Sequence, residues 1–239
     1  MHILIFNGRR SDAFGLHISG AGTFGSPARR VEKFTIPGRN GSMIIDEGTF
    51  ENIQVTYDAA AIKTMQKTSS ALREWLLSPR GYCRLEDTYH PDEYRMARFS
   101  GGLDFSEFTQ FLRSAKLKLI FDCKPQRFLK VGEAWISVET GAKIRNPTSF
   151  DAKPKIVFNA NSAECSVRIG ECIISLSGVA IGSKISIDAD TLDAYNEAGE
   201  SLNELTSISG NIVLPAGNAT DIIYDGVELL KIQPRWWIV

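Results

Sequence analysis

The sequence Ile36-Pro37-Gly38-Arg39-Asn40-Gly41 ends a run of turn signals that also contains Phe6-Asn7-Gly8 and Phe14-Gly15-Leu16. Glycine reaches positive φ without steric penalty and proline fixes its own φ, so Asn-Gly and Pro-Gly mark positions where a chain reverses. The segments between these turns are short and apolar, as strands are. No catalytic residue types gather in this run. It therefore favours a shaped β-structure that serves in an assembly over an enzyme.

Composition and charge exclude several classes of protein. The 239 residues are 43% hydrophobic and 23% charged, which is typical of a globular protein of one or two domains. The formal net charge of -1 excludes the broad basic field of a dedicated nucleic-acid-binding protein. No apolar stretch approaches the roughly 20 residues of a membrane span, and the apolar start is too short for a secretory signal.

The four cysteines, Cys83, Cys123, Cys165 and Cys172, form no Cys-x-x-Cys motif and lie near no histidine in the sequence. A disulfide scaffold would be denser in cysteine than this chain is. We therefore expect four free thiols in a reducing cytoplasm.

The first half of the chain is predicted to be a mixed β domain with one helix. Leu72 and Leu76 continue the helical spacing that starts at Met65, which predicts a helix over about residues 60–77 that ends before Pro79. Apolar side chains alternate with others from Ala115 to Cys123, as in a half-buried strand. Further strands are predicted at residues 2–6, 32–36, 42–46, 52–57, 82–86 and 94–99.

The second half is predicted to be an antiparallel β-sandwich, because it has short strands with turn signals and no helical stripe. Residues 185–188 and 195–199 are read as one hairpin, and residues 222–229 as another, turning at Asp225-Gly226. The domain boundary is placed between residues 126 and 127. The predicted strands are at residues 136–139, 155–158, 166–169, 172–176, 185–188, 212–214, 221–224 and 227–232.

No catalytic, cofactor-binding or metal-binding residue is predicted. The histidines, His2, His17 and His90, are scattered and lack a spaced carboxylate or cysteine partner. The acidic cluster of Asp188, Asp190 and Asp193 lacks the glycine and glutamate of an EF-hand loop, so it is read as the acids of a hairpin turn.

The order of short motifs along the whole chain resembles the distal tail protein (Dit) family of long-flexible-tailed, siphovirus-type bacteriophages or prophages. Each motif is mostly turn chemistry, and their order and spacing carry the resemblance. The matching pieces are Phe6-Asn7-Gly8, Phe14-Gly15-Leu16, Pro37-Gly38-Arg39-Asn40-Gly41, Trp75-Leu76-Leu77-Ser78, Gly81-Tyr82-Cys83-Arg84-Leu85, Pro91-Asp92-Glu93-Tyr94-Arg95, Phe121-Asp122-Cys123-Lys124-Pro125-Gln126, Ile187-Asp188, Leu214-Pro215-Ala216-Gly217-Asn218 and Pro234-Arg235-Trp236-Trp237.

The resemblance implies a structural protein of the virion tail, assembled in the bacterial cytoplasm. Residues 1–126 would form a tail-tube-like domain that builds a homohexameric ring, and residues 127–239 a galectin-like β-sandwich without an inserted module. The ring would join the tail tube protein to the tail tip or baseplate and to receptor-binding proteins. DNA would pass through it without specific binding. No enzymatic activity, cofactor or membrane contact is implied.

Two other functions stay open. The galectin-like half could be a carbohydrate-binding module for host-surface adhesion, with Trp135 or Trp236 stacking on sugar. It contains the turn sequence Arg145-Asn146-Pro147, but it has no histidine after His90, which argues against a galectin-type sugar site. A cell-wall hydrolase would need a converging acid pair or metal triad, which the sequence lacks.

Two groups of residues have alternative interpretations. Trp236 and Trp237 are either an exposed anchor for a partner, or packing residues of which one packs in the sheet and the other covers an edge. Five arginines either meet neighbouring subunits and the DNA channel or are solvated loop charges: Arg9, Arg10, Arg29, Arg30 and Arg39.

Overall fold

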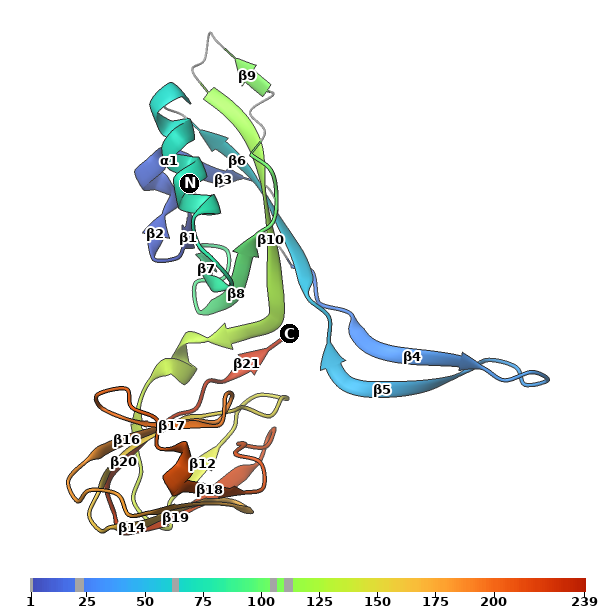
Figure 1. Cartoon of the computed structure of the whole chain (residues 1–239). Coiled ribbons are helices and arrows are strands. Elements are labelled where there is room, and N and C mark those ends of the chain that lie inside the picture. Colours follow the sequence, from blue (N-terminus) through green and yellow to red (C-terminus); the bar gives the residue numbers. More distant parts are fainter. Residues whose placement is uncertain (1, 20–23, 62–64, 104–106, 110–113) are drawn as a thin grey trace. The chain divides into compact units, whose positions relative to one another are not determined.

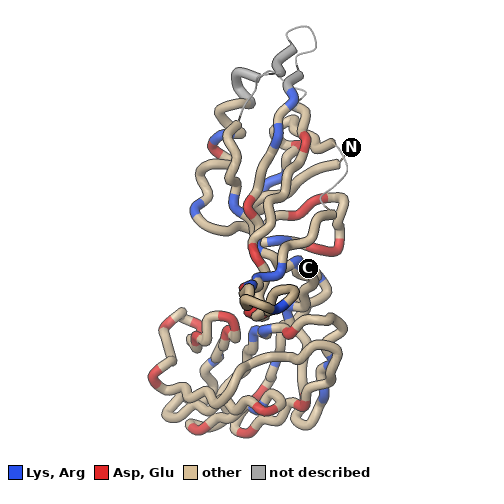
Figure 2. Tube along the Cα trace, turned by 90° about the vertical axis from the view of Figure 1, so that its right-hand side faces the viewer, with Lys and Arg blue, Asp and Glu red and all other residues tan. Residues whose placement is uncertain are grey.

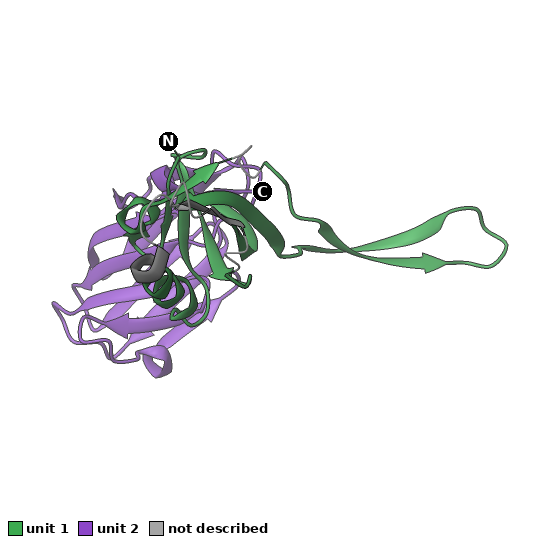
Figure 3. Cartoon of the chain, turned by 90° about the horizontal axis from the view of Figure 1, so that it is seen from above, with its two compact units in different colours: residues 1–127, 239 green, residues 128–238 purple. Residues whose placement is uncertain are grey.

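The computed structural model describes residues 2–19, 24–61, 65–103, 107–109 and 114–239 and contains two compact units (Figures 1 and 3). Unit 1 comprises Met1–Arg127 with Val239, and unit 2 comprises Phe128–Ile238. The division falls within the 16-residue strand β10 (Ser114–Leu129). Both units are mainly β, as the sequence predicts.

Unit 1 is built on a curved antiparallel sheet in which the strand order is β2-β1-β7-β8-β10-β6-β3. A bridge between His2 and Ile18 joins β3, at one end of this order, to the residues that precede β1. The elements are β1 (Leu4–Phe6), β2 (Arg9–Arg10), η1 (Ser11–Phe14), β3 (Leu16–Ser19), β4 (Arg29–Thr35), β5 (Ser42–Phe50), β6 (Ile53–Ala61), α1 (Met65–Leu77), β7 (Cys83–Asp87), β8 (Glu93–Phe99), β9 (Glu107–Thr109) and β10.

The core of unit 1 lies between this sheet and α1. Leu72, Trp75 and Leu76 of α1 are buried, and the indole N–H of Trp75 donates to the carbonyl of Phe6 at 2.9 Å. The ring of Phe6 lies 5.2 Å from that of Phe121. The predicted helix is confirmed for residues 65–77, whereas residues 60–61 belong to β6 and residues 62–64 lie outside the described part of the chain.

Alternation along β10 is confirmed, because Leu117, Leu119 and Phe121 are buried. Each of the six other predicted strands of this half corresponds to a strand whose bounds differ by a few residues. Alternating apolar residues predict a strand with one buried face, because successive side chains of a strand point to opposite faces of the sheet.

Unit 2 is an antiparallel β-sandwich of two five-stranded sheets, with the orders β11-β20-β13-β16-β17 and β12-β19-β14-β15-β18. Inward side chains such as Phe158, Val167 and Ile174 fill the space between the sheets. The elements are η2 (Lys130–Glu133), β11 (Ile136–Ser137), β12 (Lys143–Arg145), β13 (Lys155–Ala160), β14 (Glu164–Ile169), β15 (Cys172–Ser177), β16 (Lys184–Asp188), β17 (Asp193–Asn196), η3 (Asn203–Leu205), β18 (Thr206–Ser209), β19 (Ala219–Asp225), β20 (Val227–Gln233) and β21 (Trp237–Ile238).

One predicted hairpin of unit 2 is confirmed and the other is wrong. β16 pairs with β17, with Ile185 opposite Asn196. β19 and β20, however, lie in different sheets, so Asp225-Gly226 joins the two layers. Gly226 does adopt the positive φ that the motif requires, 68°. The turn signal reports this local conformation but not the sheet to which the next strand belongs. The predicted strand at residues 212–214 is reduced to a bridge between Leu214 and Ala152.

Candidate interaction surfaces

Strands β4 and β5 form a two-stranded ribbon that pairs with no other described strand. We call residues 29–50 the arm hairpin; it extends away from the rest of unit 1 (Figures 1 and 3). Its turn is the Pro-Gly-Arg-Asn-Gly sequence, in which Gly38 and Gly41 have φ values of 80° and 82°. The amide of Arg39 donates to the carbonyl of Ile36 at 3.1 Å. Local turn chemistry therefore builds the tip of the arm.

The arm hairpin exposes apolar side chains on both of its faces. Ile44 is 58% exposed, and Met43 and Ile45 are each 48% exposed. Adjacent residues of a strand point to opposite faces, so both sides of the ribbon are apolar. Phe34 and Ile36 are also exposed on β4 and at the turn. A two-stranded ribbon is at best marginally stable alone in water, and exposed apolar surface and open strand edges are features of association sites.

Charged contacts on the arm are exposed and weak. Arg29 pairs with Asp46 at 2.8 Å, and Arg30 lies 3.8 Å from Glu47. The N–H of Gly48 and the Arg29 guanidinium lower the pKa of Asp46. Exposed pairs of this kind contribute little to stability because water and salt screen them. These two arginines therefore have local partners.

The other arginines of the predicted group also lie on the surface. Arg10 pairs with Asp12 at 2.7 Å, and the Arg9 guanidinium lies 4.8 Å from the ring centre of Phe14. Basic and acidic residues are interspersed along most of the described trace, but every charged residue from Asp188 to Glu228 is acidic (Figure 2). The pairs leave the choice between solvated charge and subunit contact open, because an exposed pair is compatible with both.

The three histidines lie on separate elements. His2 stacks on Tyr89 with ring centres 4.1 Å apart, His17 is on β3, and His90 Nε2 accepts from Arg127 at 3.2 Å. No group of three or more His, Cys, Asp or Glu side chains is arranged for a metal ion in the described residues. The expectation of no catalytic, cofactor or metal site stays a prediction.

The four cysteines are free thiols. Burial raises the pKa of Cys123 to about 12, so this thiol stays protonated at neutral pH. A thiol in that state is a poor nucleophile and a poor metal ligand.

The acids at the β16–β17 turn have structural partners. Asp188 accepts two hydrogen bonds from Arg235, at 2.7 and 2.6 Å, and lies 3.3 Å from Lys155. Burial acts to raise the pKa of Asp188, but hydrogen bonds from Arg235 and from the N–H of Asp190 outweigh it and lower the pKa. Asp193 accepts from Asn203 at 3.1 Å. This arrangement agrees with the interpretation as hairpin-turn acids.

A groove of about 640 Å³ lies on the outer face of the sheet β11-β20-β13-β16-β17. Alternation along β13 turns Ile156 and Phe158 into the core and Val157 and Asn159 outward into the groove. Trp135 lines the groove and is 46% exposed. The volume is within the range of small-molecule sites, and an exposed indole beside amide and hydroxyl groups is suited to flat, polar ligands. The sequence singled out Trp135 but did not predict the groove. The available signal was the period-2 pattern of β13, which places Val157 and Asn159 on the outer face of the sheet.

The remaining candidates of unit 2 are packing residues. Trp236 is buried in the core, and Trp237 stacks on Phe150 at 4.5 Å and donates to the carbonyl of Asp151. The interpretation of the pair as packing residues of the sheet is therefore the one the structure favours. The Asn146 side chain is buried and donates to the carbonyls of Phe150 and Leu214 at 2.9 and 2.8 Å, so it is occupied in the fold.

No described helix combines the length and hydrophobicity of a membrane span. No protein-family model matches the chain, and no curated protein matches it by sequence. Solved structures do match it in fold. The Dit protein of phage SPP1, described as a paradigm of the hub adsorption apparatus in phages that infect Gram-positive bacteria, superposes with a TM-score of 0.78 at 11% identity over 100% of both chains.

Two further matches are the phage P2 baseplate in its activated conformation with calcium and with strontium. Each has a TM-score of 0.58 at 9% identity over 97% of both chains. Because these identities are low, the comparison concerns the fold. Over its full length, this chain has the fold of a phage distal tail (Dit) protein.

Proposed function

We propose that the chain is a structural distal tail protein of a siphovirus-type phage or prophage, which forms a homohexameric ring. The observation that carries this proposal is the arm hairpin. Its apolar side chains lie uncovered on both faces of a ribbon that pairs with no other described strand. A second copy of the same chain would cover this surface, and the full-length match to the SPP1 hub protein favours such an assembly.

The proposed ring would form by contacts between identical copies of the chain. An arm that packs on a different surface of the next copy makes a heterologous contact, and such contacts give a closed ring when the rotation between copies closes. The near-zero net charge of -1 offers little electrostatic repulsion between copies. Unit 1 contains the arm, so it is the part that we expect to form the ring.

The proposed ring joins the tail tube protein to the tail tip or baseplate and anchors receptor-binding proteins through unit 2. DNA passes through its centre without specific binding, in keeping with the formal net charge of -1, which provides no broad basic field. The protein acts in the virion tail, is assembled in the cytoplasm of the host bacterium and performs no catalysis.

Light scattering of the purified full chain across a concentration series tests this proposal. We expect the mass to rise toward six chains as the concentration increases. A mass of one chain at every concentration, including the millimolar range, would contradict the proposed self-association.

A second candidate function, carbohydrate binding for host-surface adhesion, is favoured by the groove with the exposed Trp135. A glycan array tests it: binding by the wild type that Trp135→Ala abolishes would support it. Ile181→Ala, an exposed apolar residue outside the groove, is the matched control. Trp236 is unsuitable for this experiment because it lies in the core, where replacement would disturb the fold.

A further inference from the structure

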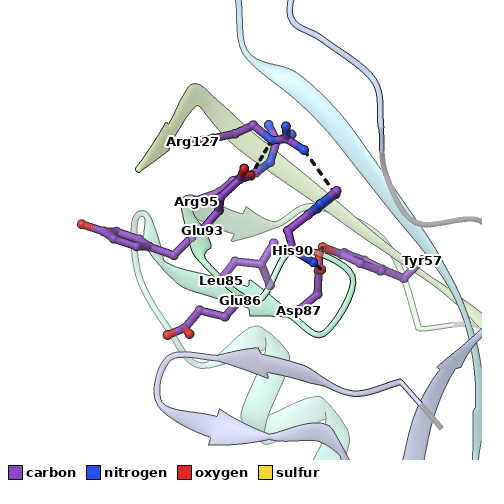
Figure 4. A pocket seen from close by; sticks show the side chains of 9 residues that line it. Tyr57, Leu85, Glu86, Asp87, His90, Glu93, Arg95 and Arg127 are labelled. Carbon is purple, nitrogen blue, oxygen red and sulfur yellow. Dashed lines mark hydrogen bonds and ion pairs between the residues drawn. The ribbon is translucent and has the colours of Figure 1, made fainter. Parts of the chain in front are cut away.

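Two arginine side chains line one small pocket in unit 1, which we call the arginine pocket (Figure 4). β8 supplies Arg95 and β10 supplies Arg127. Glu93, His90 and Asp87 also line the pocket. The pocket volume is about 10 Å³, which is about the space that one water-sized group needs. Two guanidinium groups therefore share a site that admits only a small occupant.

Asp87, one of the acids that line the pocket, already accepts hydrogen bonds at both of its carboxylate oxygens. Asp87 Oδ2 accepts from the hydroxyl of Tyr57 at 2.6 Å, and Oδ1 accepts from the backbone N–H groups of Tyr89 and His90, both at 2.9 Å. Three donors thus hold this carboxylate in place. Its oxygens are committed to the β7–β8 turn and to β6.

The second arginine of the pocket is also engaged. Arg127 Nε lies 3.2 Å from Glu93 Oε2, and Arg127 Nη2 donates to His90 Nε2 at 3.2 Å; dashed lines mark both contacts in Figure 4. Because arginine only donates, His90 accepts through Nε2. The remaining acid, Glu86, accepts from Arg84 at 2.6 Å.

Arg95 differs from these groups because its donors lack acceptors. The residue is only 6% exposed, and its Nη1 and Nη2 atoms are buried with no hydrogen-bond partner among the described residues. Burial, and next the nearby charge of Arg127, lower the pKa of Arg95. A guanidinium nevertheless stays protonated in proteins, so it remains a buried cation. Burying charged donors without acceptors is costly, and an acceptor in the pocket would remove that cost.

We propose that the arginine pocket binds one small monovalent anion, chloride or a single carboxylate group, between the guanidinium groups of Arg95 and Arg127. An anion accepts hydrogen bonds from the Nη atoms of Arg95 and offsets the repulsion between the two cations. The small volume of the pocket favours chloride or one carboxylate group over phosphate and larger oxyanions. Arginine is suited to this role because its planar donors match a carboxylate in a bidentate manner.

Chloride titration of the full-length protein at constant sodium concentration tests the site, with gluconate, which is too large to enter, as the replacing anion. Chloride is expected to stabilise the wild type in a saturable manner. At ten times its dissociation constant, it lowers the unfolding equilibrium constant by about 11-fold. Arg95→Met is expected to lose this response. Equal chloride dependence in the wild type and in Arg95→Met would overturn the proposal.

Arg98→Met is the matched control. Arg98 lies on the same strand, its side chain is 57% exposed, and its guanidinium lies 3.6 Å from the Asp122 carboxylate. The substitution removes the same charge and a side chain of the same length outside the pocket. The control variant is expected to keep the full chloride response, and its loss there would assign the response to general surface charge.

A measurement on the wild type keeps the proposal testable if Arg95→Met does not fold. Crystals soaked in bromide are expected to show an anomalous peak within contact of the Nη atoms of Arg95, and an empty pocket at saturating bromide would overturn the proposal. Two sources of the anion are distinguishable by repeating the chloride titration on assembled protein. If the natural occupant is a free ion, assembly leaves the stabilisation by chloride unchanged. If it is a carboxylate of a neighbouring chain, that group occupies the pocket in the assembly and the stabilisation by chloride is lost.

Discussion

Replacement of Met43, Ile44 and Ile45 of the arm hairpin by threonine is expected to weaken the ring without unfolding the subunit. Full burial of an aliphatic side chain stabilises by about 1.5–3 kcal/mol. About half of each of these three side chains is exposed in the subunit, so covering each one contributes about 1 kcal/mol. Threonine has the β-branched shape that strands favour, and it removes most of this apolar surface.

The triple variant should therefore lose about 2–3 kcal/mol per interface, and its dissociation constant should rise about 30- to 150-fold. Sedimentation equilibrium measures that constant. The unfolding free energy of the subunit should change by less than about 0.5 kcal/mol, because the substituted side chains lie on the surface. The matched control replaces three exposed isoleucines of unit 2, Ile173, Ile181 and Ile223, by threonine. Equal dissociation constants for the arm variant and the wild type would refute this reasoning.

Three further predictions concern the stability and reactivity of the subunit. Gly226→Ala should cost at least about 2 kcal/mol in urea unfolding, because φ is positive and the new Cβ would meet a backbone carbonyl oxygen. Gly182→Ala, which has a positive φ but free space, should cost about 1 kcal/mol. Arg235→Leu should cost about 2 kcal/mol at pH 7, because Asp188 loses its bidentate partner. Because the pKa of Asp188 is lowered in the folded state, its carboxylate stabilises the fold above the usual pKa of 3.8, and this stabilisation is lost as the pH falls through the folded pKa. The difference in unfolding free energy between Arg235→Leu and the wild type should therefore narrow below pH 3.8. A difference that stays unchanged there would contradict the role assigned to Arg235. Burial should protect Cys123 from iodoacetamide at pH 8 until the protein unfolds, as peptide mass spectrometry would show, and modification of the native protein would disprove it.

Local patterns in the sequence were sufficient to predict most of the longer elements, whereas short strands such as β3, β12 and β18 were missed. The alternation from Leu117 to Phe121 and the helical spacing of Leu72 and Leu76 report burial directly, since the period of a buried face is fixed by backbone geometry. The turn at Ile36–Gly41 was equally visible, because Gly38 needs a positive φ.

Long-range features were not predictable in the same way. Asp225-Gly226 has the composition of a hairpin turn, yet the strands on its two sides enter different sheets. That choice depends on how both strands bury their apolar faces in one core, which a dipeptide does not encode. The arginine pocket was missed for a similar reason: Arg95 lies on β8 and Arg127 on β10, and only the sheet brings them together. The one available signal was the position of Arg95, which alternates in phase with Ala97 and Phe99 on the buried face of β8.

Negative-stain electron microscopy of the purified full chain tests the central claim most directly, namely that copies of this chain cover the apolar arm by closing around an axis. The account predicts six-fold annular class averages with a central hole at micromolar concentration, and their loss in the triple arm variant. Class averages that contain only isolated single subunits across the accessible concentration range, for the wild type as well as for the variant, would contradict it.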